Sequence, residues 1–205
     1  MARPRSDSFE QKREDILTHA AASFAATGYP AASMNDIAAT SGTSKARLYH
    51  YYGSKEAILF DLLDRYTQRL LAVIGQVEAT AQRRKLDDRA ALHELVRTFL
   101  AEYENAATRH VALLNDTKHL GDAQRDVILN RQRDVVAAVT RFLRRAYPAR
   151  VQETNQTPVA MMLFGMINWT FTWLKPQGTM SYAAFANEVI AMLDGGLGEK
   201  PTGSP

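Results

Sequence analysis

The sequence predicts an all-α protein in which an N-terminal helix-turn-helix domain is joined by a long helix to a larger helical domain. Apolar residues recur at helical spacing in nearly every segment of the 205 residues, and no alternating run bounded by turn residues indicates a strand. Ser, Asp and Gly also stand where helices usually begin and end. With 46% hydrophobic residues, the chain can form one or two domains with cores.

The N-terminal helices are predicted from their capping residues. A first helix is expected from Ser8 to Gly28, because this stretch has an apolar face and ends at a glycine. Ser33 begins a short second helix, and Ser44 begins a third after the break at Gly42. Two helices across a tight glycine turn have the helix-turn-helix layout, in which the second helix enters the major groove of DNA.

The rest of the chain is predicted to be helical as well. Ser54 begins a long fourth helix that is apolar at helical spacing as far as Val77, so it is expected to connect the two domains. A charged linker is expected at residues 82–89. Further helices are expected at residues 88–107, 111–119, from 122 to the exit at Pro148, at 157–173, and from 181 to the pair Gly195-Gly196.

Composition limits the possible functions. A net charge of +3 permits a polyanionic partner without identifying one. The lack of cysteine excludes disulfides, thiolate nucleophiles and cysteine-ligated metals. The N-terminus shows no signal peptide, and the longest apolar run, residues 159–174, is shorter than the roughly 20 residues that span a bilayer. We therefore expect a cytoplasmic protein with no membrane partner.

The third predicted helix carries cationic and aromatic side chains around one apolar anchor, Leu48. Arg47 is suited to a bidentate contact with guanine, and Tyr49 and Tyr51 can bond phosphates or pack on a thymine methyl. Hydroxyl, ammonium and free N–H groups at helix N-termini favour phosphate oxygens. From these residues alone, an amphipathic surface helix with half-buried tyrosines is an equal alternative.

The stretch GYPAASMNDIAATSGTSKARLYHYYGSKEAIL resembles the N-terminal domain of TetR-family transcriptional regulators. Its Gly-Tyr, Asp-Ile-Ala, Ser-Gly, Leu-Tyr-x-Tyr and Ser-Lys-Glu elements occur in the order and at the spacing of that family. Ala46 stands where glycine is frequent and Arg47 where a small hydroxyl residue is frequent, which leaves the operator sequence open. The residues predicted to contact bases or phosphates are Ser33, Ser44, Lys45, Ala46, Arg47, Tyr49, His50, Tyr51, Ser54 and Lys55.

The resemblance implies a homodimer, with a DNA-binding domain at residues 8–56, a ligand-binding and dimerisation domain at 57–198, and tails at 1–7 and 199–205. Family members pair their last two helices, and the apolar, close-packing faces of those helices suit this role. An internal core helix is the alternative. The predicted interface residues are Met161, Phe164, Gly165, Asn168, Phe185, Val189 and Met192.

The stretch MLFGMINWTFTWLKPQGTMS resembles TetR members that govern fatty-acid or phenylacetate breakdown and sense acyl-CoA thioesters. Aromatic and methionine side chains could line a tunnel for an acyl chain, and cations could meet the CoA phosphates. Plain core and solvated cations are the alternatives. The predicted ligand residues are Phe99, Tyr103, Arg109, Lys118, His119, Arg131, Met162, Met166, Trp169 and Trp173.

Two other functions agree less well with the sequence. An enzyme is disfavoured because the five histidines show no metal-ligand spacing and no phosphate-cradling glycine loop or nucleophile elbow occurs. An architectural DNA-binding protein would leave most of the chain without a purpose. The sequence thus predicts a ligand-responsive repressor, not an enzyme, that binds a pseudo-palindromic operator as a homodimer. It needs no cofactor and is released by a small effector such as an acyl-CoA thioester.

Overall fold

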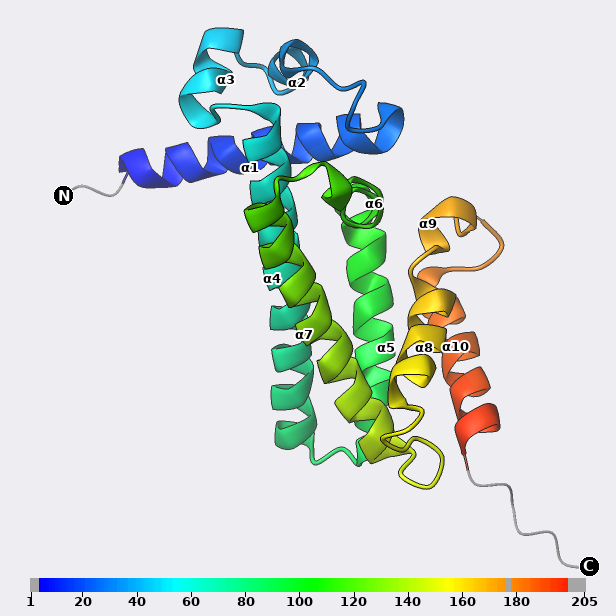
Figure 1. Ribbon diagram of the computed structural model, residues 1–205. Coiled ribbons are helices and arrows are strands. Elements are labelled where there is room, and N and C mark those ends of the chain that lie inside the picture. The colour runs from blue at the N-terminus through cyan, green and yellow to red at the C-terminus, as the bar shows by residue number, and fades with distance from the viewer. Residues whose placement is uncertain (1–3, 176–177, 199–205) are drawn as a thin grey trace, which may run out of the picture. The chain divides into compact units, whose positions relative to one another are not determined.

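The structure is a computed structural model that describes residues 4–175 and 178–198, with side chains described from Ser8 onward (Figure 1). Every element assigned within these residues is a helix, which confirms the predicted fold class. The elements are α1 (Pro4–Thr27), α2 (Met34–Thr40), α3 (Lys45–Tyr51), α4 (Lys55–Arg84), α5 (Asp88–Asn105), α6 (Ala107–Asp116), the 3-10 turn η1 (Thr117–His119), α7 (Asp122–Ala146), α8 (Gln156–Ile167), α9 (Thr170–Trp173) and α10 (Tyr182–Leu197).

The described chain separates into two compact units. Unit 1 holds α1, α2, α3, the part of α4 up to Gln68, and the segment Thr108–Asn130. Unit 2 holds the remainder of α4, α5, the rest of α7, and α8 to α10. The units therefore follow packing and not chain order, and the boundaries at 8–56 and 57–198 stay a prediction.

Serine hydroxyls cap the helix N-termini that the sequence marked. The hydroxyl oxygens of Ser33, Ser44 and Ser54 each accept a hydrogen bond from the backbone N–H three residues later, at 3.1, 3.2 and 3.0 Å. Ser181 does the same at 3.1 Å. Each bond satisfies one of the N–H groups that a helix leaves without a partner in its first turn, so these starts could be placed from local sequence.

Several predicted helix ends differ. Helix α1 begins at Pro4 instead of Ser8, because proline fits the first turn of a helix, where no N–H is needed. Residues 4–7 are therefore helical and not a tail, whereas the predicted tail at 199–205 lies outside the described residues. Helix α8 stops at Ile167 before the separate α9. Helix α10 continues through the predicted glycine stop to Leu197, since glycine disfavours a helix interior by only about 1 kcal/mol.

The predicted linker at 82–89 is only a tight turn at residues 85–87. Lys85 adopts a left-handed backbone conformation with φ of 52°, and the N–H of Leu86 bonds the carbonyl oxygen of Ala81 at 2.9 Å. This pattern closes the C-terminus of α4. Asp87 then caps α5 by accepting from the N–H of Ala90 at 2.7 Å, so the chain reverses within three residues.

The core of unit 1 places the helix-turn-helix. Ile16, Ala20 and Phe24 of α1 are buried, as the predicted apolar face requires. Ile37 of α2 and Leu48 of α3 are fully buried as well, and α2 and α3 lie along one side of α1 (Figure 1). Leu48 is the buried residue of α3 and anchors that helix in the core of unit 1.

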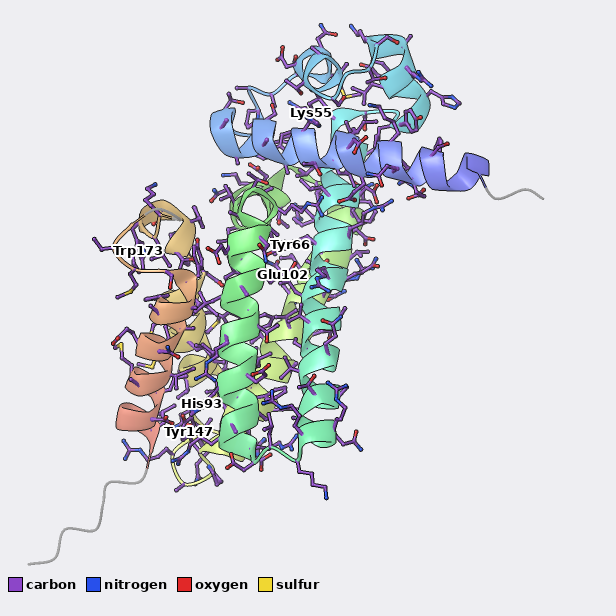
Figure 2. All side chains as sticks on the ribbon, turned by 180° about the vertical axis from the view of Figure 1, so that it is seen from behind. Lys55, Tyr66, His93, Glu102, Tyr147 and Trp173 are labelled. Atoms are coloured by element: carbon purple, nitrogen blue, oxygen red, sulfur yellow. The ribbon has the colours of Figure 1, made fainter. Side chains whose placement is uncertain are left out.

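Unit 2 is built around α5, whose buried face includes Leu92, Leu95 and Phe99. Helices α5 and α10 lie side by side (Figure 2). Asp194 of α10 accepts hydrogen bonds from the hydroxyl of Tyr147 at 2.7 Å and contacts the His93 imidazole at 3.2 Å. Its carboxylate therefore ties the ends of α5, α7 and α10 together.

None of the described helices combines the length and apolar character that crossing a membrane requires. Within the same described residues, no group of three or more His, Asp or Glu side chains is arranged to hold a metal ion.

Candidate nucleic-acid interface and sensor surfaces

Helix α3 presents most of its side chains to solvent. Around fully buried Leu48, the side chains of Lys45, Arg47 and His50 are exposed, and Tyr49 has 46% of its surface exposed. Ala46 is exposed too, and Tyr51 is half-buried. The structure thus brings the predicted base-reading residues together on one short helix whose polar groups are available to a partner.

Ser33 is less free than its predicted phosphate contact requires. Its hydroxyl accepts from the backbone N–H of Asp36 at 3.1 Å and lies 2.6 Å from the Asp36 carboxylate, to which it donates. A phosphate at this hydroxyl would have to displace a carboxylate, so its predicted contact stays without geometric support. Ser44 and Ser54 are exposed beside their capped N–H groups, as anion contact at a helix N-terminus requires.

Lys55 requires a correction. Its ammonium donates to the carbonyl oxygens of Tyr29 and Ala32, both at 2.7 Å, and to that of Pro30 at 3.3 Å. It also lies 4.4 Å from the centre of the Tyr29 ring. All three ammonium protons therefore have acceptors inside unit 1, and Lys55 holds the turn after α1 instead of offering its charge to phosphate.

A polar clamp that the sequence analysis missed fixes the end of α3. Tyr52, which caps α3, donates to the Asp61 carboxylate at 2.6 Å, and the Arg13 guanidinium donates to the same carboxylate at 2.7 Å. Arg65 approaches it from the next turn of α4 at 3.0 Å. Arg13 and Asp61 are 48 residues apart, and no local sequence signal pairs residues at that separation.

The electrostatics of the clamp follow from this geometry. Burial raises the pKa of the Asp61 carboxyl, but hydrogen bonds from Tyr52 and Arg65 and the nearby positive charges outweigh it and hold that pKa below its ordinary value. Burial, together with the hydrogen bond to Asp61, raises the pKa of the Tyr52 phenol. Asp61 therefore stays ionised and Tyr52 stays neutral near neutral pH, which keeps the end of α3 attached to α1 and α4.

The structure divides the predicted ligand residues between the units. Arg109, Lys118 and His119 belong to unit 1, and the other seven belong to unit 2. The Arg109 guanidinium bonds the Glu14 carboxylate and donates to Thr18 at 3.2 Å. The His119 ring stacks on Tyr29 at 5.0 Å. Arg109 and His119 thus take part in the packing of unit 1, while Lys118 is exposed.

In unit 2, the predicted tunnel-lining residues do not share one environment. Phe99 and Tyr103 are buried and stacked 5.9 Å apart, and the Tyr103 hydroxyl donates to Asn168 at 3.2 Å. By contrast, Met162, Trp169 and Trp173 are 70%, 54% and 51% exposed, so their prediction as walls of an enclosed tunnel is wrong for this chain taken alone. Met166 and Arg131 are half-buried. A cleft of about 390 Å³ in unit 2 is lined by other residues, including Gln82, Lys85 and Phe142.

The predicted dimer interface is partly corrected. Met161 and Met192 are 47% and 67% exposed and Gly165 is exposed, as an interface requires. Phe185 is half-buried, and its ring contacts that of Trp173. Phe164 and Val189 are instead 5% and 1% exposed, so they pack inside unit 2. Asn168 is occupied with Tyr103. The exposed apolar side chains of unit 2, here called the apolar face, are Met161, Met162, Trp169, Trp173 and Met192.

A helix-turn-helix with an exposed cationic second helix, combined with a second helical unit, defines a DNA-binding transcriptional regulator. Residues 16–62 match the family model described as bacterial regulatory proteins, tetR family. Residues 85–197 match the model of the tetracyclin repressor-like C-terminal domain. The chain belongs to the TetR family, which confirms the resemblance seen in its sequence. Because members of this family are transcriptional regulators, the prediction that the protein is not an enzyme is also confirmed.

The relatives support the same assignment. The transcriptional repressor KstR2 of Mycolicibacterium smegmatis is 24% identical over 192 residues, which cover 91% of this chain and 90% of KstR2. A TetR-family regulator from Bordetella parapertussis has a TM-score of 0.82 and 35% identity, with 88% and 92% of the two chains covered. AibR, solved with isovaleryl coenzyme A and operator DNA, has a TM-score of 0.75 and 24% identity, with 88% and 97% covered; at that identity the likeness concerns the fold.

Proposed function

We propose that the protein is a ligand-responsive repressor that binds a pseudo-palindromic operator in the cytoplasm as a homodimer and leaves it when a small effector binds. DNA binding is supported above all by the exposure pattern of α3. Its one fully buried side chain is Leu48, and Lys45, Arg47 and Tyr49 are exposed. Arginine and lysine donate to guanine, and tyrosine donates to phosphate. Such a helix has little to gain from packing within its own subunit and much from a groove of DNA.

The homodimer is supported by the apolar face of unit 2. Large apolar side chains that are half or more exposed, such as Met162 and Met192, mark protein interaction sites when they occur together. Exposed Gly165 allows close approach of a second helix. A twofold dimer would present two α3 helices about 34–36 Å apart, one turn of DNA, and so read a pseudo-palindrome.

Ligand response is supported by the chain segments that make up unit 1. Its segment Thr108–Asn130 falls within the match to the C-terminal family model, yet it belongs to the same compact unit as the helix-turn-helix. The Glu56 carboxylate at the start of α4 accepts from the Gly121 N–H at 2.7 Å. The Tyr66 hydroxyl of α4 lies 3.2 Å from Nδ1 of His110 on α6. An effector that displaces α6 would therefore also move α4. The effector can shift the population between the original and the displaced arrangement only by the difference between its affinities for the two.

An acyl-CoA thioester is the effector class we propose. The resemblance of residues 162–181 to acyl-CoA-sensing TetR members supports it, and so does the AibR neighbour, whose structure holds isovaleryl coenzyme A. Phe99, Tyr103 and Met166 of unit 2 are the residues that could accept an acyl chain, since they lie in or near its core.

The test uses a duplex that the wild-type protein selects from a randomised DNA library. Fluorescence anisotropy then follows its release by isovaleryl-CoA and by long-chain acyl-CoAs, with free CoA as the control. Release by an acyl-CoA and not by CoA is expected, and native mass spectrometry should show the same compound bound. A duplex that no acyl-CoA releases would reject this effector class, and an architectural protein would be indifferent to every compound tested.

Arg47 provides the matched test of DNA reading. Arg47→Ala should weaken binding by about 1–3 kcal/mol and relax the sequence preference at one position, because a bidentate contact to guanine discriminates between bases. Selection of duplexes by the variant measures the preference. An unchanged selected sequence would show that Arg47 does not read a base.

A further inference from the structure

Phe9 is an exposed aromatic residue on α1 and lies outside the predicted DNA-binding and ligand-binding residues. It has 37% of its surface exposed, which is high for a phenylalanine. Its ring lies 4.7 Å from the ring of Tyr51, with an interplanar angle of 31°, and 6.5 Å from the His50 imidazole, edge to face. His50 and Tyr51 are themselves edge to face at 5.8 Å. These three rings, Phe9, His50 and Tyr51, form what we call the aromatic cluster.

The aromatic cluster joins α1 to His50 and Tyr51, the last two residues of α3, directly before the clamp at Tyr52. Leu48 is the buried residue of this seven-residue helix, and neighbouring Tyr49 is 46% exposed. Offset and edge-to-face ring pairs at these distances are attractive beyond the area they bury. The contact with Phe9 therefore restricts the rotamers of Tyr51 and His50.

The turn of α1 that carries Phe9 is itself fixed. The next residue, Glu10, accepts from Arg13 at 3.1 Å and from Arg65 of α4 at 3.0 Å. Hydrogen bonds from Arg65 and Arg13 lower the pKa of the Glu10 carboxyl, although burial opposes them. A ring mounted on an anchored turn can hold a neighbouring side chain in one orientation, whereas a ring on a fraying end cannot.

We propose that Phe9 is a positioning residue for DNA reading, which acts by orienting Tyr51 and His50 before DNA binds. The proposal rests on the proposed function, in which α3 enters the major groove. Binding normally costs the ordering of each rotamer-rich side chain that it immobilises. By ordering two DNA-facing side chains in the free protein, Phe9 removes part of that cost.

The test measures DNA affinity for the wild type and four variants, using the duplex that the wild type selects from a randomised library. Phe9→Ala should weaken binding of the dimer by about tenfold to hundredfold, since both subunits lose preordered side chains. Phe9→Tyr keeps the ring and should bind like the wild type. In the Tyr51→Ala background, Phe9→Ala should change affinity by less than about twofold, because its main partner is gone.

Controls separate positioning from folding. Thermal unfolding is recorded for each variant, and Phe9→Leu, which keeps apolar bulk without a ring, replaces Phe9→Ala if that variant is poorly folded; the same loss of affinity is expected. Val127→Ala on α7 alters an apolar residue with the same 37% exposure and should leave DNA affinity unchanged. A wild type that selects no duplex would reject the proposed function itself.

If the wild type selects a duplex, two outcomes overturn the positioning role. One is unchanged affinity of Phe9→Ala and Phe9→Leu. The other is an equal loss of affinity on removing Phe9 in the presence and absence of the Tyr51 ring, because Phe9 would then act by its own DNA contact or through the fold.

Discussion

Helix α3 and the helices α8 and α10 all present side chains to solvent, but they differ in chemistry and in anchoring. Helix α3 exposes cations and phenols, and Leu48 is its buried residue. Helix α8 exposes methionines and buries five residues, including Leu163 and Ile167. The first pattern suits a polyanion and the second an apolar protein surface. The chemistry of the exposed side chains therefore indicates the partner, and exposure alone does not. The number of buried side chains in a helix determines how much the loss of one of them lowers the free energy of unfolding.

The largest effect is expected at the single anchor of α3. Leu48→Ala should lower the free energy of unfolding by about 2–5 kcal/mol, because it leaves a cavity under a helix with no other fully buried side chain. Tyr49→Ala, which removes a 46% exposed neighbour, should change it by less than about 0.5 kcal/mol. Urea unfolding measures both. Similar losses in the two variants would show that α3 is not held by one residue.

The next effect concerns the apolar face. Met192→Glu places a charge where we propose that two subunits pack, and should weaken dimerisation by about 2 kcal/mol or more, roughly thirtyfold. Val127→Glu, which adds the same charge at an exposed apolar site on α7, is the control. Sedimentation velocity over a concentration series reports the dissociation constant. A Met192→Glu dimer as tight as the wild type would remove this residue from the interface.

Lys45 at the start of α3 and Lys55 at the start of α4 should separate a structural role from DNA contact. Lys55→Met leaves the carbonyls of Tyr29 and Ala32 without their donor and should cost about 1–2 kcal/mol of stability. Exposed Lys45→Met should cost less than about 0.5 kcal/mol but reduce the salt dependence of DNA binding by about one phosphate contact. Urea unfolding and salt titrations test the pair. A reduced salt dependence in Lys55→Met would restore its phosphate role.

The smallest effect is a pH dependence at the clamp below α3. The folded state lowers the pKa of Asp61, so the carboxylate contributes stability above its unfolded pKa, and this contribution is lost as pH falls through the folded pKa. Asp61→Asn should be less stable than the wild type by about 1 kcal/mol at pH 7, and the difference should shrink below about pH 4. Because the comparison isolates one carboxyl, a constant difference down to pH 3 would contradict the clamp.

Much of the fold was predictable because helix signals are local. The hydroxyls of Ser33 and Ser44 act on N–H groups three residues away, and the apolar spacing of Ile16 and Phe24 reflects one helix face. The helix-turn-helix pattern lies within one short stretch for the same reason. The helix ends at Ile167 and Leu197 differ from the prediction, because a glycine pair or an apolar run does not by itself determine where a helix stops.

Distant neighbours decided the rest. Lys55 carries the expected charge at the expected helix start, yet its protons go to carbonyls 23 to 26 residues away. Met162 and Phe164 are both apolar and lie two residues apart, yet one is 70% exposed and the other 5%. Residue type and spacing determine which side chains can bind DNA or an apolar partner. The tertiary hydrogen bonds and packing decide which of these side chains remain available to a partner. They join residues that are far apart in the sequence, so spacing along the chain does not reveal them.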